Sequence, residues 1–269
     1  MITLKLITQP VAPLEADCIT PDHFLGKAAA EIASLPVAYG NQRGSLGDFF
    51  SVTGDGADEI LIEGDLSRVK HIGVGMTQGQ ITVQGNVGMH LGAGMCGGQI
   101  ILHGNADDWA GAEMRGGQIH IHGNAGHELG GAYRGARRGM NRGLIVVDGN
   151  AGNEVGSVMR RGVVVVGGDT GEFTGAFMIA GSILVFGKLG ERAGAGMKRG
   201  SIITWHQPKL LPTFRYACTY HPTFLRLLLQ DLLAAGVQIA GEWMEGRYRR
   251  YSGDLTALGK GEILAWEGL

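Results

Sequence analysis

The chain has 269 residues and a formal net charge of −2, with 44% hydrophobic and 18% charged residues. These values are sufficient for one large domain with a sizeable core, and they give no indication of binding to nucleic acid or to an anionic membrane. Glycine is unusual: there are 48 glycines, more than twice the share of about 7% that is typical of proteins. With only 7 prolines and many Val, Ile and Leu residues, the chain fits neither collagen nor a disordered segment.

Residues 1–60 are the first of three predicted regions. They begin with a strand-like stretch (ITLKLIT), continue through a candidate short helix over Pro21–Leu35, and reach a stretch from Pro36 to Val52 that contains several glycines. Repeat proteins need capping elements at their ends, so we interpret residues 1–60 as an N-terminal cap. The start lacks the basic and apolar stretches of a signal peptide, and no segment approaches about 18 consecutive apolar residues. We therefore expect a cytoplasmic protein.

The three cysteines, Cys18, Cys96 and Cys218, are widely separated and form no CxxC or Cys/His spacing. This pattern argues against an iron–sulfur cluster, a zinc finger and a disulfide framework. A reducing compartment is the simplest interpretation.

Residues 61–205 are the second region and carry a repeat of nineteen residues. Each unit opens with Gly, usually followed by Asn or Asp, and has Gly again seven positions later, Met at ten, Gly at thirteen, and β-branched or other apolar residues at fifteen and seventeen. Two units are longer: one by two residues, and one by seven residues inserted around Arg134–Met140. Units that fit the frame open at Gly85, Gly104, Gly149, Gly168 and Gly187, and the two longer units open at Gly64 and Gly123.

Each unit contains one short run of strand-forming residues bounded by glycine, such as IILH, VVVV and SILVF. Runs this short cannot bury an apolar face alone, but equivalent strands of successive units can stack in parallel about 4.8 Å apart. We therefore predict a mainly β fold, a right-handed parallel β-helix of about seven coils. Glycine would mark corners that need positive φ or a close approach of two coils, and Asn after the opening glycine would hydrogen-bond between coils.

Alternation along the strands assigns their two faces. Positions fifteen and seventeen of each unit, such as Ile100, should point into the core, with the Met column filling gaps. Positions sixteen and eighteen should point outward, and their character changes from polar at Thr82 and Gln84 to apolar at Leu184 and Phe186. Because an exposed apolar column is costly, the late coils need a cover.

Residues 206–269 are the third region. Thr223–Ala235 read TFLRLLLQDLLAA, which predicts a helix that ends near Gly236 and is buried around most of its circumference. We predict that this helix packs across the late coils or into a partner. The tail Gln238–Leu269 is expected to be an ordered peripheral extension. Arg247–Arg250 is one short basic run on a slightly acidic chain, which argues against a nucleic-acid site.

The repeated Gly-x-x-Met-x-x-Gly pattern, preceded by the Tyr39-Gly-Asn and Leu46-Gly-Asp-Phe-Phe stretches, resembles the C-type subunits of formylmethanofuran dehydrogenases. The glycine-rich pattern is also similar to the C-terminal domain of the large subunit of glutamate synthase. The first resemblance covers nearly the whole chain, and the second covers only about residues 60–205. In aerobic methylotrophic bacteria, the counterpart of the first family is the formyltransferase/hydrolase complex, which interconverts formyl-tetrahydromethanopterin, formylmethanofuran and formate during one-carbon oxidation.

The resemblance implies a structural, non-catalytic subunit of a larger enzyme. It implies a hetero-oligomer with amidohydrolase-like, B-type and formyltransferase subunits, and it assigns zinc-dependent formyl hydrolysis to another chain. It implies no cofactor on this chain, although a methanofuran-type cofactor is expected in the complex, and no catalytic residue is carried over. The sixteen Arg against seven Lys favour a bacterial source, so the bacterial complex is preferred over the methanogen enzyme.

Three histidines on neighbouring predicted strands are candidate metal ligands. His120 and His122 share one strand face, and His103 falls one coil away from His122, at the strand spacing of about 4.8 Å. We find no carboxylate or thiol in the same column to complete a ligand set, and outward-facing histidines on a β surface commonly make interface contacts. The sequence therefore favours an interface or solvated role over a metal site.

The seven-residue insert is the best candidate for a functional loop, because insertions in repeat proteins often lie on the binding face. It places four arginines on a loop that projects from a regular rod: Arg134, Arg137, Arg138 and Arg142. Three roles stay open: a solvated loop, docking of a partner, and contact with the acidic tail of a methanofuran-type cofactor. The third rests on the bidentate pairing of guanidinium groups with carboxylates.

Three other functions have weaker support. GxGxxG-like strings occur near Gly73 and Gly92, but a dinucleotide-binding site needs a helix after the glycines, and none is predicted there. A self-contained β-helix enzyme acting on sugars needs paired carboxylates, and the strand faces contain almost no Asp or Glu. No Ser/His/Asp or Cys/His grouping has a recognisable local context, although parallel coils can bring distant residues together.

Overall fold

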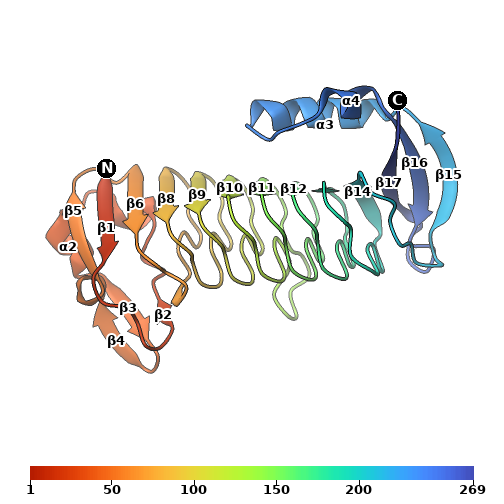
Figure 1. Ribbon diagram of the computed structural model, residues 1–269. Coiled ribbons are helices and arrows are strands. Elements are labelled where there is room, and N and C mark those ends of the chain that lie inside the picture. The colour runs from red at the N-terminus through yellow and green to blue at the C-terminus, as the bar shows by residue number, and fades with distance from the viewer.

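The computed structural model describes all 269 residues, and its largest element is one sheet of thirteen strands. The fold is mainly β, and eight of these strands follow one another along an elongated stack (Figure 1). They are β6 (Glu59–Glu63), β8 (Gln80–Gln84), β9 (Gln99–His103), β10 (Gln118–Ile121), β11 (Leu144–Val147), β12 (Val163–Val166), β13 (Ser182–Val185) and β14 (Arg199–Thr204).

Each of these strands pairs in parallel with the next, and equivalent residues of the repeat lie level with one another. Ile81 lies beside Ile100, which lies beside Ile119. Paired residues are 19 positions apart in the sequence between β8 and β9, between β9 and β10, and at each pairing from β11 to β14. The spacing is 26 residues between β10 and β11, where Gln118 pairs with Leu144. The seven-residue insert is therefore accommodated between two strands without disturbing their pairing.

Glycine allows successive backbones to approach closely at the corners. A Cβ atom on Gly116 would lie 2.2 Å from the carbonyl oxygen of Cys96 in the preceding unit. A Cβ atom on Gly85 would lie 2.0 Å from the carbonyl oxygen of Gly64. No side chain fits at these distances, so the spacing of the stack depends on glycine here. The glycine columns predicted at positions seven and thirteen adopt the predicted positive φ, for example 61° at Gly92 and 76° at Gly98, so that prediction is confirmed.

Asparagine side chains join successive units through hydrogen bonds. The Oδ1 atom of Asn86 accepts from the backbone N–H of Asn105 at 2.9 Å, and Asn105 accepts from Asn124 at 2.8 Å. The ladder continues from Asn124 to Asn150 at 2.8 Å, and from there to Asp169 at 2.7 Å. These bonds satisfy backbone donors that lie outside the strands, and the predicted hydrogen bonding between units is confirmed.

The interior of the stack is apolar. Inward strand residues such as Ile100 and Leu102 are fully buried, as the alternation predicts. They belong to one cluster of 48 buried residues that extends through the stack. Burial of one such side chain stabilises the fold by about 1.5–3 kcal/mol. The methionine column is also fully buried: Met76, Met95, Met114, Met140, Met159, Met178 and Met197.

Residues 1–60 lie at one end of the stack. β1 (Ile2–Leu6) is parallel to β6 and antiparallel to β5 (Phe50–Gly54), so it belongs to the main sheet. The single helix predicted over 21–35 is instead two short helices, because Gly26 between them adopts a left-handed conformation with φ 75°. The remaining elements include a second sheet of four strands. They are β2 (Leu14–Glu15), β3 (Pro36–Tyr39), β4 (Gln42–Ser45), β7 (Val69–Lys70), α1 (Pro21–Phe24), α2 (Ala29–Ala33) and the 3-10 helix η1 (Leu46–Asp48).

The C-terminal residues add three strands to the other end of the sheet. β15 (Arg215–Tyr220), β16 (Arg247–Gly253) and β17 (Lys260–Gly268) pair antiparallel in that order, and β17 is parallel to β14. We expected the tail to be a peripheral extension. The tail is ordered, but β17 continues the main sheet, because Ile263 lies beside Ile202 and is buried in the same core.

The outer face of the late strands is covered by α3 (Thr223–Ala234), which is followed by α4 (Gly241–Glu245) (Figure 1). The predicted packing of this helix across the late coils is confirmed. Leucines of α3 and outward-facing strand residues form a second buried cluster. Its members include Leu225, Leu229 and Leu232 of α3 and Val146, Val165, Leu184 and Ile203 of the strands.

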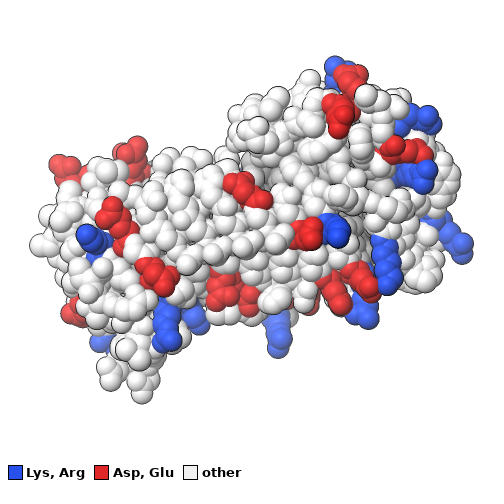
Figure 2. Space-filling model, viewed as in Figure 1, with Lys and Arg blue, Asp and Glu red and all other residues white.

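The surface carries both signs of charge. In the view of Figure 2, Lys and Arg side chains are more frequent toward the C-terminal end, whereas Asp and Glu occur along the whole length. The same view shows a step, because the C-terminal segment covers the late strands and leaves the early strands uncovered. No helix has both the length and the apolar composition that crossing a membrane requires.

The close approach of backbones at Gly116 leads to a stability prediction. Gly116→Ala is expected to destabilise the chain by about 1–3 kcal/mol or more, because its Cβ would overlap a backbone carbonyl that cannot move aside. Gly241→Ala is the matched control, since nothing lies within 4 Å of a Cβ there. Urea unfolding of both variants measures the difference. Equal midpoints would contradict the role given to glycine.

Candidate functional site

Two histidines and one aspartate meet on the outer face of the sheet, beside β10 and β11. His120 lies on β10, His122 follows that strand, and Asp148 follows β11. The register that pairs Ile121 with Val147 brings Asp148 level with His122. His120 Nε2 lies 2.8 Å from one carboxylate oxygen of Asp148, and His122 Nδ1 lies 2.7 Å from the other. The carboxylate therefore bridges the two imidazole rings.

The expectation that no carboxylate lies in the histidine column was wrong. The insert lengthens one unit, so the column runs from His103 to His122 after nineteen residues and reaches Asp148 only after 26. In the sequence, this carboxylate could have been recognised as the aspartate at the end of the strand-forming run LIVVD. His103 stacks on His122, with ring centroids 4.8 Å apart and an interplanar angle of 13°. His103 is not one of the three residues whose potential ligand atoms lie within 4.8 Å of one another.

Asp148 is ionised at neutral pH. Burial alone would raise the pKa of its carboxyl, but hydrogen bonds from His120 and His122 outweigh burial and hold the pKa below its ordinary value. The three residues line one side of a cavity of about 420 Å³ between the sheet and the C-terminal end of α3. Apolar side chains, including Phe186 and Val237, line other parts of it. A cavity with a few convergent polar groups and apolar walls is suited to a small ligand or an ion.

The arginine-rich insert lies elsewhere on the surface, where it projects as a green loop from the edge of the stack in Figure 1. Arg134 and Arg142 are exposed, and neither lines the cavity that the other two arginines share. The structure brings the other two arginines together around a cavity of about 290 Å³. Three guanidinium groups and a single carboxylate there leave a positive local charge, which suits an anionic group. The charged residues that line this cavity are Arg137, Arg138, Arg115 and Glu113.

A column of non-glycine residues with positive φ runs along one corner of the stack and was not predicted. This backbone conformation costs a residue with a Cβ about 1–2 kcal/mol, and glycine would avoid most of that cost. Large side chains at such a corner therefore indicate that the side chains themselves serve a purpose. The signal was a spacing of nineteen residues, lengthened to 26 by the insert between Glu128 and Glu154, with residue types that change from unit to unit. The members are His71, His90, Trp109, Glu128, Glu154, Phe173 and Arg192, with φ values between 59° and 68°.

Four rings contact one another at the N-terminal end of this corner column. His90 stacks on Trp109 with centroids 5.4 Å apart, and its ring contacts that of His71 at 4.8 Å. The hydroxyl of Tyr133 lies 2.9 Å from His90 Nδ1. Burial, together with nearby His71 and Lys70, lowers the pKa of His90 to about 4. His90 is therefore neutral at pH 7, and the cluster presents aromatic faces that can pack against a partner.

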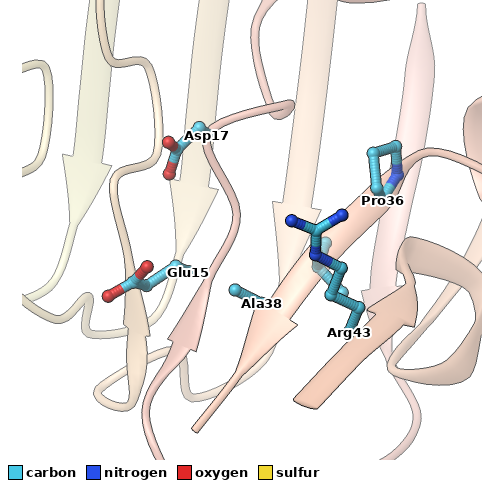
Figure 3. A pocket seen from close by; sticks show the side chains of 6 residues that line it. Glu15, Asp17, Pro36, Ala38 and Arg43 are labelled. Atoms are coloured by element: carbon cyan, nitrogen blue, oxygen red, sulfur yellow. The ribbon is translucent and has the colours of Figure 1, made fainter. Parts of the chain in front are cut away.

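A further cavity of about 270 Å³ lies beside the second sheet. Figure 3 shows Arg43 on one side of this space, with Glu15 and Asp17 on the other. Asp17 also contacts His71 Nδ1 at 2.7 Å, so one of the two carboxylates is engaged with the corner column. The cavity holds mixed charges without a cluster of three metal-ligand groups.

Comparisons with known proteins show the family to which the chain is similar. The family model described as the GXGXG motif matches residues 99–214. The C-type subunit of tungsten-containing formylmethanofuran dehydrogenase 2 from Methanothermobacter marburgensis is 49% identical over 86 residues, which are 30% of this chain and 32% of that protein. The C-type subunit of the formyltransferase/hydrolase complex Fhc from Methylorubrum extorquens is 41% identical over 88 residues, 33% of each chain. These curated matches span about a third of each relative.

A solved structure is similar over nearly the whole chain. It is the crystal structure of the formyltransferase/hydrolase complex (FhcABCD) from Methylorubrum extorquens in complex with methylofuran. One chain of that complex superposes with a TM-score of 0.92 and 38% sequence identity. The superposition covers 98% of this chain and 98% of the other.

The lowered pKa of His90 predicts a pH dependence of stability. An unfolded histidine titrates near 6.5, whereas His90 in the folded chain titrates at about 4. As the pH falls through this window, the unfolded chain binds the proton first, so stability is lost between about pH 6.5 and 4. His90→Phe should show a smaller fall of the thermal midpoint across this window than the wild type. Phe173→Leu, at the same corner position in a distant unit, removes no titrating group and should keep the wild-type slope, and an unchanged slope in His90→Phe would refute the assignment.

Proposed function

This chain belongs to the family formed by the C-type subunits of formylmethanofuran dehydrogenases and of formyltransferase/hydrolase complexes, and we propose that it is the structural, non-catalytic C-type subunit of a formyltransferase/hydrolase complex. The observation that carries the proposal is the similarity over 98% of both chains to one chain of the bacterial complex. A match confined to the glycine-rich repeat would support the fold alone.

In this proposal, the complex converts formyl-tetrahydromethanopterin by way of formylmethanofuran to formate during one-carbon oxidation. The chain contributes no catalytic group. Zinc-dependent hydrolysis takes place in an amidohydrolase-like partner, and B-type and formyltransferase subunits complete the hetero-oligomer. A methanofuran-type cofactor serves the complex, and the similar solved complex contains methylofuran.

The proposal includes a specific architecture, a right-handed parallel β-helix with a nineteen-residue repeat over residues 61–205. Its support is the 19-residue offset between most paired strands and the strong preference for right-handed parallel connections. Residues 1–60 would then be the N-terminal cap. Residues 206–269 would pack on the coils and on partners.

A scaffold needs outer surfaces that partners can cover, and two features of the chain support such a role. On α3, Leu227 and Leu233 are 64% and 50% exposed, although the opposite side of the helix is buried. Phe224, which is 40% exposed, lies three residues before Leu227 on α3, and exposed apolar side chains that adjoin one another favour a protein contact. The corner column from His71 to Arg192 is the second feature, because large side chains are kept there in an unfavourable backbone conformation.

The arginine-rich insert is proposed to contact either a partner or the acidic tail of the cofactor. The cavity beside it has room for an anionic group, and the arginines around it can pair with carboxylates. A cytoplasmic location is also part of the proposal. The three cysteines are free, which is consistent with a reducing compartment.

Two other functions remain candidates. The first is the C-type subunit of a methanogen-type formylmethanofuran dehydrogenase, since the relative from Methanothermobacter marburgensis is 49% identical over 86 residues and the bacterial relative is 41% identical over 88 residues. The second is a structural β-helix domain of the glutamate synthase type, which the GXGXG match over the repeat favours.

Purification of the tagged chain from its native cells tests the proposed function. We expect stoichiometric companions that include an amidohydrolase-like chain and a formyltransferase. A molybdenum or tungsten enzyme chain without a formyltransferase would instead favour the methanogen-type dehydrogenase. A glutaminase companion would favour the glutamate synthase alternative, and a chain that purifies alone would contradict a scaffold role.

The double variant Arg137→Ala/Arg138→Ala tests the role of the insert. Loss of two charged contacts should weaken partner assembly or cofactor retention by about tenfold or more, because a hydrogen bond to a charged group contributes about 1.5–3 kcal/mol. Arg160→Ala/Arg161→Ala is the matched control, an adjacent pair outside the insert. Mass photometry of the complex and mass spectrometry of retained cofactor separate the two roles. If both values equal those of the control, the insert is a solvated loop.

A further inference from the structure

The cluster of His120, His122 and Asp148 is the one place in the chain where three side chains of metal-ligand type converge. Their potential ligand atoms all lie within 4.8 Å of one another. The fold creates this convergence in two steps. Alternation places both histidines on the outer face of one strand, and the parallel register then adds the aspartate from the next unit. His120 lies on β10, and His122 and Asp148 directly follow β10 and β11, so the paired strands hold the backbones of all three residues in place.

We propose that His120, His122 and Asp148 bind a divalent transition-metal ion of the zinc class. Two imidazole nitrogens and one carboxylate oxygen are a ligand set used for Zn²⁺ and for Fe²⁺, with the remaining coordination positions left to water or substrate. The site lacks thiolate and thioether groups, which select Cu⁺, and the two imidazoles disfavour Mg²⁺ and Ca²⁺, which prefer oxygen ligands.

The surroundings suit an ion with open coordination positions. The ligand groups line a cavity of about 420 Å³, which leaves space for water or a small ligand beside the ion. The side chains of His120, His122 and Asp148 are 21%, 37% and 46% exposed, so an ion can enter from solvent without unfolding of the sheet. Phe186 and Val237 limit access of water from the apolar side and would strengthen the attraction between ion and carboxylate.

Two further features position the ligands. The ring of His103 stacks on His122 at 4.8 Å, which restricts rotation of the His122 ring. Gly236, Val237 and Gln238, which also line the cavity, follow the C-terminal end of α3. The partial negative charge at the end of a helix favours a cation.

The two hydrogen bonds in the cluster are compatible with this use. Each neutral imidazole carries one proton, and a shift of that proton to the other ring nitrogen frees a lone pair for the metal. Metal binding would then replace two hydrogen bonds by three coordinate bonds.

Titration of the full chain, expressed alone and stripped of metal, with Co²⁺ and with Zn²⁺ tests the proposal. We expect one equivalent of Co²⁺ to bind, with the visible absorption of a low-coordinate cobalt site, and Zn²⁺ to displace it. Zn²⁺ should also raise the thermal midpoint, because an ion that binds only the folded chain stabilises it.

Two variants assign the binding to the cluster. His120→Gln and Asp148→Asn should each weaken Co²⁺ binding by more than about 100-fold, since loss of a residue that merely supports a ligand costs 10–100-fold. His71→Gln and His90→Phe are the matched controls; neither residue belongs to the cluster, so both variants should bind Co²⁺ with the affinity of the wild type. Circular dichroism checks that all four variants fold, and the two ligand variants are separate substitutions, so misfolding of one leaves the other informative.

The proposal is overturned by any of three results. The first is that the wild type binds no Co²⁺ with a defined stoichiometry. The second is that binding survives unchanged in both His120→Gln and Asp148→Asn, which would place the ion at other histidines. The third is an equal loss of binding in the ligand variants and in the two controls.

Discussion

The close contact between backbones of successive units is the constraint on which the rest of the structure depends. A Cβ atom on Gly116 or Gly85 would lie about 2 Å from a carbonyl oxygen of the neighbouring unit, so only glycine permits the stack to form at strand spacing. Once the units are stacked, equivalent residues of the repeat become neighbours in space. Residues from the same position of the repeat therefore line up as a column along the surface of the stack. The residue types in a column determine the chemistry of that part of the surface.

The outward columns show how one repeat yields different surfaces. In the early units the outer face carries polar residues such as Thr82 and Gln84, and the step in Figure 2 shows that this part of the sheet is left uncovered. In the late units the same face is apolar, and α3 covers it through a second buried cluster. The histidine–aspartate cluster lies where the cover ends, beside Val237 and Phe186. A site at that boundary has both a solvent-accessible side and an apolar side. The early units alone or the late units alone would provide only one of the two.

Much of the architecture could be predicted because the repeat is strict. The spacing of glycine and methionine predicted the corners and the core, and the apolar outer face predicted a covering helix. Asp148 and the left-handed corner were missed for one reason, because both depend on residues that vary between units. Asp148 escaped notice because the insert moved it from a nineteen-residue to a 26-residue spacing. The left-handed corner was hidden because His, Trp, Glu, Phe and Arg replace one another there. The role of β17 was missed because its sequence lacks the repeat, although it pairs in register with β14.

Distances between corners of the stack test this architecture most directly. Thr77, Arg160 and Lys198 occupy the same corner position in different units, four units apart for the first two and six for the first and last. Nitroxide labels at these sites, in a variant without exposed cysteines, allow the separations to be measured by pulsed electron spin resonance. Stacking in register predicts distances of about 19 Å from Thr77 to Arg160 and about 29 Å from Thr77 to Lys198. Separations that fail to grow with the number of intervening units would contradict the stack and every column built on it.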